Sequence, residues 1–326
     1  MEATRGGCGP DRVGAWFGPP GEQEQRGLRV EMQRDAAFVD DLAADADEPG
    51  LVPPASATDW VQYDLAVRKP APDLYRALGS TLDELLAGNV AEEGFFVHKS
   101  PGMRFRIRPS AGCLPAAATI ARSTLAELVH SGQITGWHPA VYEPEQRLFG
   151  GPASMHAVHQ VFTADSVAWL RYHALPNAVR RPDAAVWALS LSMIRVLFEA
   201  LEIVGWESVD VWDRLGSTGG RILSADATVD PLVHRLGQRI RDGWADPAGL
   251  RSGLSAEAGA LLADYELAVR PAAAKWRSDY FHTAGATVGP RQAAAYTVIF
   301  HWNRAGLPLH HQSLITGLLV TAQDRR

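Results

Sequence analysis

The order of hydrophobic periodicities between residues 60 and 143 constrains the fold more than any other feature of this sequence. Apolar residues alternate with polar ones along 61–67, which predicts a strand, and recur three or four residues apart from Pro72 to Gly88, which predicts a helix. The same reasoning predicts, in chain order, strand 94–97, strand 103–108, helix 116–130 and strand 137–143. This β-α-β-β-α-β order is that of the ferredoxin-like, split βαβ arrangement.

From Gly151 onward the periodicity becomes helical. It predicts helices at 153–161, 164–173, 183–204, 229–243, 254–269, 290–304 and 309–322. The stretch 183–204 is the most apolar and is expected to be a buried core helix, because its charged residues Arg195, Glu199 and Glu202 argue against a membrane span. The predicted fold class is α+β, with a ferredoxin-like half followed by a helical half.

The first part of the chain differs from the rest in charge and composition. Residues 1–60 carry 12 acids and 5 Lys/Arg, net −7, which leaves 25 acids and 26 bases, net +1, in residues 61–326 of a chain whose total is −6. Gly, Pro and like charge together are typical of loosely ordered segments. We therefore expect residues 1–58 to be an acidic, flexible extension and residues 59–326 to form the folded domain.

The overall composition excludes several classes of protein. A net charge of −6 argues against sequence-independent binding of nucleic acid. The cysteines Cys8 and Cys113 are too few for a disulfide framework, and they lack the additional ligands that a structural zinc site needs. The sequence shows neither a secretory signal nor an apolar run of membrane-spanning length. We therefore expect a cytoplasmic protein without a membrane partner and without a bound metal.

The strand at 103–108 carries three arginines at alternate positions. Arg104, Arg106 and Arg108 share one face of that strand, while the apolar residues between them share the other. No acid occurs between Glu93 and Glu127 to pair with them locally. Guanidinium groups bind carboxylates and phosphates with two parallel hydrogen bonds, so the segment is interpreted as an anion cradle, with a solvent-facing strand as the alternative.

A second group of polar residues lies on the helix predicted at 290–304. Thr297, His301 and Arg304 fall on one helical face. A histidine beside a cation tends to stay neutral and can serve as a general base. The alternative interpretation is a core histidine, with Asn303 and Arg304 capping the helix before Gly306.

A third segment joins the last predicted strand to the helical half. It runs from Tyr142 through Glu145 and Arg147 to an aromatic-Gly-Gly-Pro sequence at 149–152. His156 and His159 follow on the next helix, and without a third ligand they are expected to be surface or loop histidines rather than metal ligands.

Taken together and in this order, the segments resemble the C-terminal domain of lantibiotic dehydratases, in the stand-alone form described as thiopeptide-type bacteriocin biosynthesis proteins. The resemblance spans about residues 60–322. It is carried by Phe95-Phe96-Val97-His98-Lys99 leading into Met103-Arg104-Phe105-Arg106, by Tyr142-Glu143-Pro144-Glu145 through Gly150-Gly151-Pro152, by Phe162-Thr163-Ala164-Asp165-Ser166, and by Phe300-His301-Trp302-Asn303-Arg304 before Gly306-Leu307.

The resemblance implies an enzyme that modifies a ribosomally made precursor peptide carrying a leader. One family chemistry eliminates glutamate from a glutamylated Ser or Thr. The other is a formal [4+2] cycloaddition of two dehydroalanines that forms a pyridine-type core and releases water and the leader. By the resemblance, Arg104 and Arg106 match the arginines that hold the glutamyl group, and His301 matches a functional histidine. A third functional arginine precedes the aromatic-Gly-Gly sequence, where this chain has Leu148, with Arg147 one residue early.

Because of Leu148, the first hypothesis is a pyridine synthase belonging to the lyases. His301 would act as acid and base, Arg104 and Arg106 would position substrate carbonyls or leader, and Tyr280 or Tyr296 would donate to the amide oxygen. The residues expected to bind substrate or leader are Lys99, Arg108, Arg147, His282, Asn303 and Arg304. Neither chemistry requires a metal or an organic cofactor. The expected partners are the precursor peptide and other enzymes of the pathway, and a homodimer is compatible with the sequence.

Two other hypotheses stay open at the level of the sequence. One is a glutamate-eliminating subunit of a split, tRNA-dependent dehydratase. The other is a non-catalytic scaffold that binds the leader.

Overall fold

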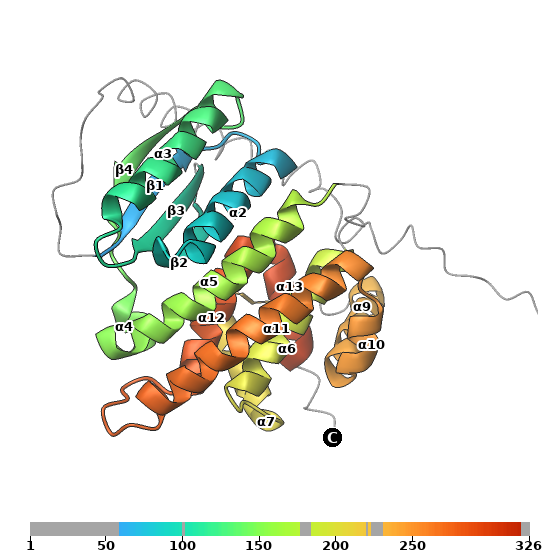
Figure 1. Ribbon diagram of the computed structural model, residues 1–326. Coiled ribbons are helices and arrows are strands. Elements are labelled where there is room, and N and C mark those ends of the chain that lie inside the picture. Colours follow the sequence, from blue (N-terminus) through green and yellow to red (C-terminus); the bar gives the residue numbers. More distant parts are fainter. Residues whose placement is uncertain (1–58, 100–101, 177–183, 220, 223–230, 321–326) are drawn as a thin grey trace, which may run out of the picture.

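A four-stranded antiparallel sheet forms the first half of the described chain (Figure 1). The computed structural model describes residues 59–99, 102–176, 184–219, 221–222 and 231–320, so the predicted extension 1–58 lies outside it. The strands are β1 (Val61–Ala66), β2 (Ala91–Lys99), β3 (Gly102–Pro109) and β4 (Gly136–Ala140), and their order in the sheet is β2-β3-β1-β4. This is the spatial order of the ferredoxin-like arrangement, which confirms the predicted α+β class.

Two helices, α2 (Pro72–Ala87) and α3 (Leu114–His130), pack against each other beside the sheet (Figure 1). Helix α2 forms where the sequence predicts it, because Pro72 starts the first turn and Asp73 adds a negative charge near the positive end of the helix dipole. Its leucines at 74, 78, 82 and 85 are buried. The side chain of Leu82 reaches the backbone of β2 at Gly94, where any Cβ would collide with it. Glycine at this position therefore allows helix and strand to approach closely.

The second half is helical. Its elements are α4 (Gln146–Phe149), α5 (Pro152–Ala174), α6 (Ala184–Ala200), α7 (Trp206–Gly219), α9 (Pro231–Ala245), α10 (Pro247–Ser252), α11 (Ala256–Trp276), a π-helical turn (Arg277–Phe281), α12 (Pro290–Ala305) and α13 (Leu309–Val320).

The structure corrects the predicted helices in three places. The helices predicted at 153–161 and 164–173 are one continuous helix, α5, because Thr163 bonds back to the His159 carbonyl and does not interrupt it. Helix α7 was not predicted, although Val211, Trp212 and Leu215 form a buried helical face in it. Helix α11 continues past the predicted end at 269 and contains a proline at 271, because packing against α5 and α6 holds it together.

The outer edge of β2 is closed by side chains from the helical half. Residues at alternate positions of an edge strand direct their N–H groups away from the sheet. Three such groups have side-chain acceptors: the N–H of Gly94 donates to Thr163 Oγ1 (3.1 Å), that of Phe96 to Ser166 Oγ (3.2 Å) and that of His98 to Asn303 Oδ1 (2.7 Å). Thr163 and Ser166 are one helical turn apart on α5, so α5 replaces the missing neighbouring strand.

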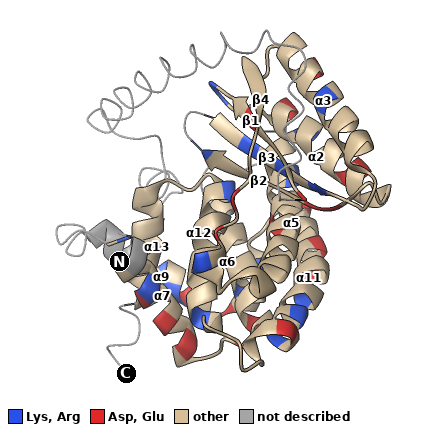
Figure 2. Ribbon diagram, turned by 90° about the vertical axis from the view of Figure 1, so that its left-hand side faces the viewer, with Lys and Arg blue, Asp and Glu red and all other residues tan. Residues whose placement is uncertain are grey.

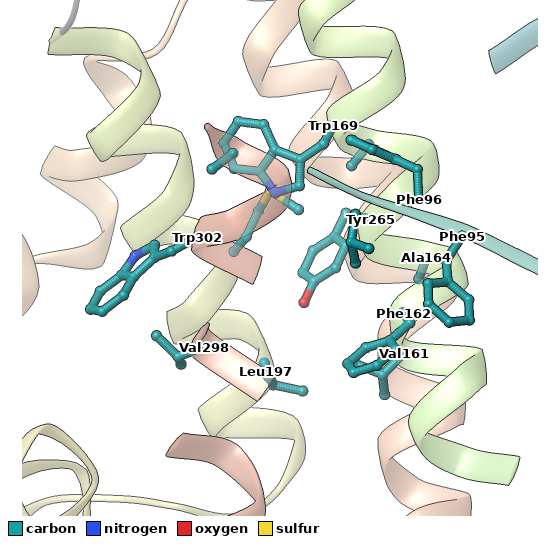
Figure 3. Close-up of a cluster of buried hydrophobic side chains, with 14 of the residues drawn as sticks. Phe95, Phe96, Val161, Phe162, Ala164, Trp169, Leu197, Tyr265, Val298 and Trp302 are labelled. Atoms are coloured by element: carbon teal, nitrogen blue, oxygen red, sulfur yellow. The ribbon is translucent and has the colours of Figure 1, made fainter. Parts of the chain in front are cut away.

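One cluster of buried apolar side chains runs through both halves. Figure 3 shows part of it, with side chains from β2 next to side chains from the helices, including Phe95, Phe96, Phe162, Trp169, Tyr265 and Trp302. None of the helices in the described part of the chain combines the length and apolarity that a membrane crossing requires.

Candidate functional site

The arginine strand forms as the sequence predicts, but its arginines have partners. The register places Asp64 of β1 opposite Arg104, and the Arg104 Nε to Asp64 Oδ2 distance is 3.5 Å. Arg108 contacts Glu92, and its Nε lies 3.1 Å from Glu93 Oε2. The prediction that these arginines lack ion-pair partners is therefore wrong, because the neighbouring antiparallel strands supply the acids.

Arg106 is the buried member of the three. Its side chain donates from Nε to Gln62 Oε1 (2.7 Å), and its guanidinium carbon lies 4.2 Å from the centre of the Tyr142 ring. The Nη1 atom is buried and has no hydrogen-bond partner among the described residues. Burial lowers the pKa of Arg106, whereas the carboxylate of Glu145 favours its charge. An arginine stays protonated in this setting, so Arg106 offers one free donor beside an aromatic face.

A buried carboxyl, Glu93, lies next to two histidines of α5. His156 Nδ1 is 3.0 Å and His159 Nδ1 3.8 Å from the carboxyl oxygens. Burial raises the pKa of Glu93 to about 7, against the opposing effect of Arg108. Burial, followed by the charges of Arg108 and Arg106, lowers the pKa of His159 to about 3. At neutral pH His159 is therefore an uncharged imidazole, and Glu93 exchanges a proton readily.

The two histidines were expected to be surface or loop residues, and this is wrong for His159, which is buried within α5. Its Nε2 lies 2.8 Å from the Tyr142 hydroxyl, whose pKa burial raises well above the ordinary tyrosine value. Burial and the nearby Arg108 and Lys275 lower the pKa of His156, so its contact with Glu93 is that of a neutral ring.

We call Arg106, Tyr142, His159, Glu93 and Arg108 the sheet-face network. It combines a free guanidinium donor, a phenol, a neutral imidazole and a carboxyl that titrates near neutrality. Groups of this kind can exchange protons at neutral pH, and perturbed pKa values of this size are frequent in functional sites. Tyr142, His159 and Glu93 were not among the predicted site residues, because their role depends on burial, which has no signal in the local sequence.

The predicted residue His301 lies in a different place, inside the helical half. Its Nδ1 is 2.6 Å from Asp165 Oδ1 and its Nε2 is 2.9 Å from Ser190 Oγ. The carboxylate fixes Nδ1 as the donor, so in the singly protonated ring Nε2 accepts from Ser190. The His301 side chain is only 4% exposed. Three helices, α5, α6 and α12, thus meet at one imidazole.

Arg304 completes this buried cluster. Its Nε donates to Asp165 Oδ2 at 2.5 Å, and its guanidinium carbon lies 4.5 Å from the centre of the Phe162 ring. Burial by itself raises the pKa of Asp165, but the charges and hydrogen bonds of His301 and Arg304 bring it below the ordinary aspartate value. We call Asp165, Ser190, His301 and Arg304 the buried cluster.

Tyr280 lies in a third place, in the π-helical turn after α11. Its hydroxyl accepts the backbone N–H groups of Thr287 and Val288, each at 3.0 Å. Although burial alone raises the pKa of Tyr280, these bonds and the Thr287 side chain lower it. Gly150 packs directly on the hydroxyl, where a Cβ would overlap it. The aromatic-Gly-Gly sequence and Tyr280 therefore form one packed unit.

The remaining predicted residues are scattered. Tyr296 is half-buried against Phe149, with ring centres 6.0 Å apart. The side chain of Asn303 is used by the backbone of His98. Three residues predicted to bind substrate or leader are exposed at the surface: Lys99, Arg147 and His282. The structure thus divides the predicted set among the sheet face, the buried cluster, the Tyr280 unit and these scattered positions.

Figure 2 shows Lys and Arg on the strands of the sheet, and acidic and basic segments mixed along α7 and α11. Basic side chains therefore lie on the sheet as well as on the helices, and on β3 they face Asp64, Glu92 and Glu93. Within the described residues, no group of His, Cys, Asp and Glu side chains could hold a metal ion.

Comparison with known proteins shows the family to which this chain belongs. The family model of the lantibiotic biosynthesis dehydratase C-terminal domain matches residues 60–322. The chain belongs to this family. The span is the one indicated by the sequence resemblance, which is confirmed. A search of curated proteins found no match.

Among solved structures, the fold is similar to that of the tRNA dependent lantibiotic dehydratase MibB from Microbispora sp. 107891, with a TM-score of 0.59 and 21% sequence identity. The match covers 84% of this chain and 29% of that one. The protein thus spans under a third of the length of MibB and is similar in fold to the matched part.

Proposed function

We propose that this protein is a pyridine synthase, which joins two dehydroalanines of a ribosomal precursor peptide by formal [4+2] cycloaddition and releases water and the leader. The observation that carries the proposal is the pairing of two of the three β3 arginines with acids. Arg104 and Arg108 already face Asp64 and the pair Glu92 and Glu93.

Glutamate elimination makes a different demand. The departing carboxylate needs guanidinium groups free to clamp it. In this chain a carboxylate approaching β3 would meet Asp64, Glu92 and Glu93, which repel it. The family resemblance places a further clamp arginine directly before the aromatic-Gly-Gly sequence, where this chain has Leu148. Leu148 is half-buried against the core, and Arg147 is exposed.

Cycloaddition needs neutral donors and acceptors instead. An amide between two residues must shift its proton from nitrogen to oxygen to give a 2-azadiene, which must be held in register with the alkene. The sheet-face network supplies such groups: the Tyr142 hydroxyl, the uncharged His159 and the Glu93 carboxyl. Arg106 Nη1, which is buried and has no partner among the described residues, would hold a substrate carbonyl.

In this proposal the proton transfers belong to the sheet-face network. His301 and Tyr280 act as positioning residues, because Asp165 and Ser190 engage both ring nitrogens of His301 and two backbone N–H groups engage the Tyr280 hydroxyl. The partners we propose are the leader-bearing precursor peptide and the pathway enzymes that install its dehydroalanines.

The alternative is glutamate elimination. The unpartnered Nη1 of Arg106 favours it, because this one group would donate to the carboxylate of the departing glutamate. Mass spectrometry on two synthetic peptides separates the two. One peptide carries a leader and two dehydroalanines flanked by thiazoles, and the other carries a glutamylated serine. We expect release of leader and water from the first. Loss of glutamate from the second alone would replace the proposal by the eliminase, and no turnover with tight leader binding would replace it by a scaffold.

A further inference from the structure

A cavity of about 560 Å³ lies between α5 and α11, which run side by side (Figure 1). Most of its wall is made of small or apolar side chains from these two helices, among them Ala164, Val167, Ala168, Leu261, Ala268 and Ala272. Alanines at facing positions keep the helices from filling the space between them. The volume is in the range of sites that hold a small ligand or a few residues of a peptide.

One end of the cavity holds Glu93. Its side chain is 2% exposed, and both carboxyl oxygens are buried without accepting a hydrogen bond from any described residue. Arg108 Nε lies 3.1 Å and His156 Nδ1 3.0 Å from the carboxyl oxygens, but neither contact has hydrogen-bond geometry. Buried carboxyl oxygens nearly always accept hydrogen bonds, so this acceptor calls for a donor that enters through the cavity.

The charges around the cavity nearly cancel, with one acid in excess. At the Glu93 end, Glu92 and Glu93 face Arg108 and Lys275, while His156 and His159 are uncharged. At the other end Arg171 is paired with Asp83 and Asp264. A strongly charged ligand would lose its hydration here without a free counter-charge to compensate, whereas a neutral group that donates a hydrogen bond fits both the wall and Glu93.

We propose that this cavity binds an uncharged segment of the precursor peptide's core, with an amide N–H of that segment donating to the Glu93 carboxyl. The site rests on the proposed function, because it takes the peptide as the substrate. It adds the place where the core lies and the chemistry that selects it, namely an apolar wall and one buried acceptor. The apolar wall and the paired charges around it disfavour a strongly charged leader in this cavity.

The test is fluorescence anisotropy with the full-length protein and two labelled probes. One probe is the core peptide with two dehydroalanines and no leader, and the other is the leader alone. Ala268 lines the cavity yet is exposed, so Ala268→Phe fills the cavity without overpacking the core. Ala274, exposed on the same helix and outside the cavity wall, gives the matched control Ala274→Phe.

We expect Ala268→Phe to weaken core binding by about ten-fold or more, and Ala274→Phe to leave it unchanged. Glu93→Leu should weaken it by about ten-fold, while Glu93→Gln, which keeps an acceptor oxygen, should weaken it by less than about three-fold. Leader binding should be the same in all four variants.

Unchanged core affinity in Ala268→Phe would overturn the site, as would a loss of leader affinity in that variant. The outcome is separable from that of the proposed reaction. A protein that forms no pyridine yet binds the core in an Ala268-dependent way loses the reaction and keeps the site. A protein that forms pyridine equally fast with Ala268→Phe keeps the reaction and loses the site.

Discussion

His98 and Asn303 exchange three hydrogen bonds although they are 205 residues apart. The Asn303 side chain accepts from the His98 N–H at 2.7 Å and donates to the His98 carbonyl at 2.6 Å, and the His98 ring donates from Nδ1 to the Asn303 carbonyl at 2.7 Å. The side-chain amide thus mimics a neighbouring strand and joins the end of β2 to the end of α12. Asn303 is expected by sequence to bind substrate or leader, but its side chain is already occupied by the fold.

Replacing Asn303 by alanine should destabilise the protein by about 2–4 kcal/mol, because two backbone groups of β2 lose their partners in a half-buried place. Urea unfolding at pH 7 measures this. A change below about 1 kcal/mol would mean that water replaces the amide at no cost, and that Asn303 is free for another role.

Replacing Asp165 by asparagine should cost about 3–5 kcal/mol at pH 7, because Arg304 is then left buried without its counter-charge. The pKa of Asp165 is lowered in the folded protein, so its stabilising effect is present above the unfolded value of 3.8 and is lost as the pH falls below it. Unfolding experiments from pH 7 to pH 3 should therefore show the difference between wild type and variant shrinking with acid. A constant difference would contradict the role of charge.

Glu93 should make stability depend on pH in the opposite direction. Its pKa is raised from 4.5 to about 7, so the folded state binds the proton more tightly, and stability is lost as the pH rises through this interval. The loss is about 3 kcal/mol for a shift of this size. Glu93→Gln cannot ionise and should gain stability over wild type from pH 4.5 to 8. The matched control is Glu92→Gln, since Glu92 is half exposed in the same strand.

Gly150→Ala should displace Tyr280. Gly150 has a φ of +88°, which costs an alanine about 1–2 kcal/mol, and the new Cβ would also overlap the Tyr280 hydroxyl. Tyr280→Phe removes that oxygen, so the two changes together should cost less than their sum. A double-mutant cycle by thermal unfolding measures the coupling. Strict additivity would show that the two residues do not contact each other in solution.

Much of the fold could be predicted from the sequence, because its signals are local. The alternation of Met103–Arg108 correctly predicts which side chains share a face of β3, and the leucines of 72–88 correctly predict helix α2. The errors are also instructive. The sequence pattern predicts two helices, 153–161 and 164–173, whereas in the structure α5 is continuous and the Thr163 hydroxyl contacts both the helix backbone and the edge of β2.

The site was less predictable, because its chemistry depends on which residues are brought together and how deeply they are buried. Sequence alone determined that three arginines share a strand face and that His301 and Arg304 share a helix face. Only the tertiary structure decided that strand register pairs those arginines with Asp64 and Glu93, and that Asp165 and Ser190 occupy both nitrogens of His301. It also decided that Glu93 titrates near neutrality, since a pKa follows from desolvation and neighbouring charges, and both are properties of the folded chain.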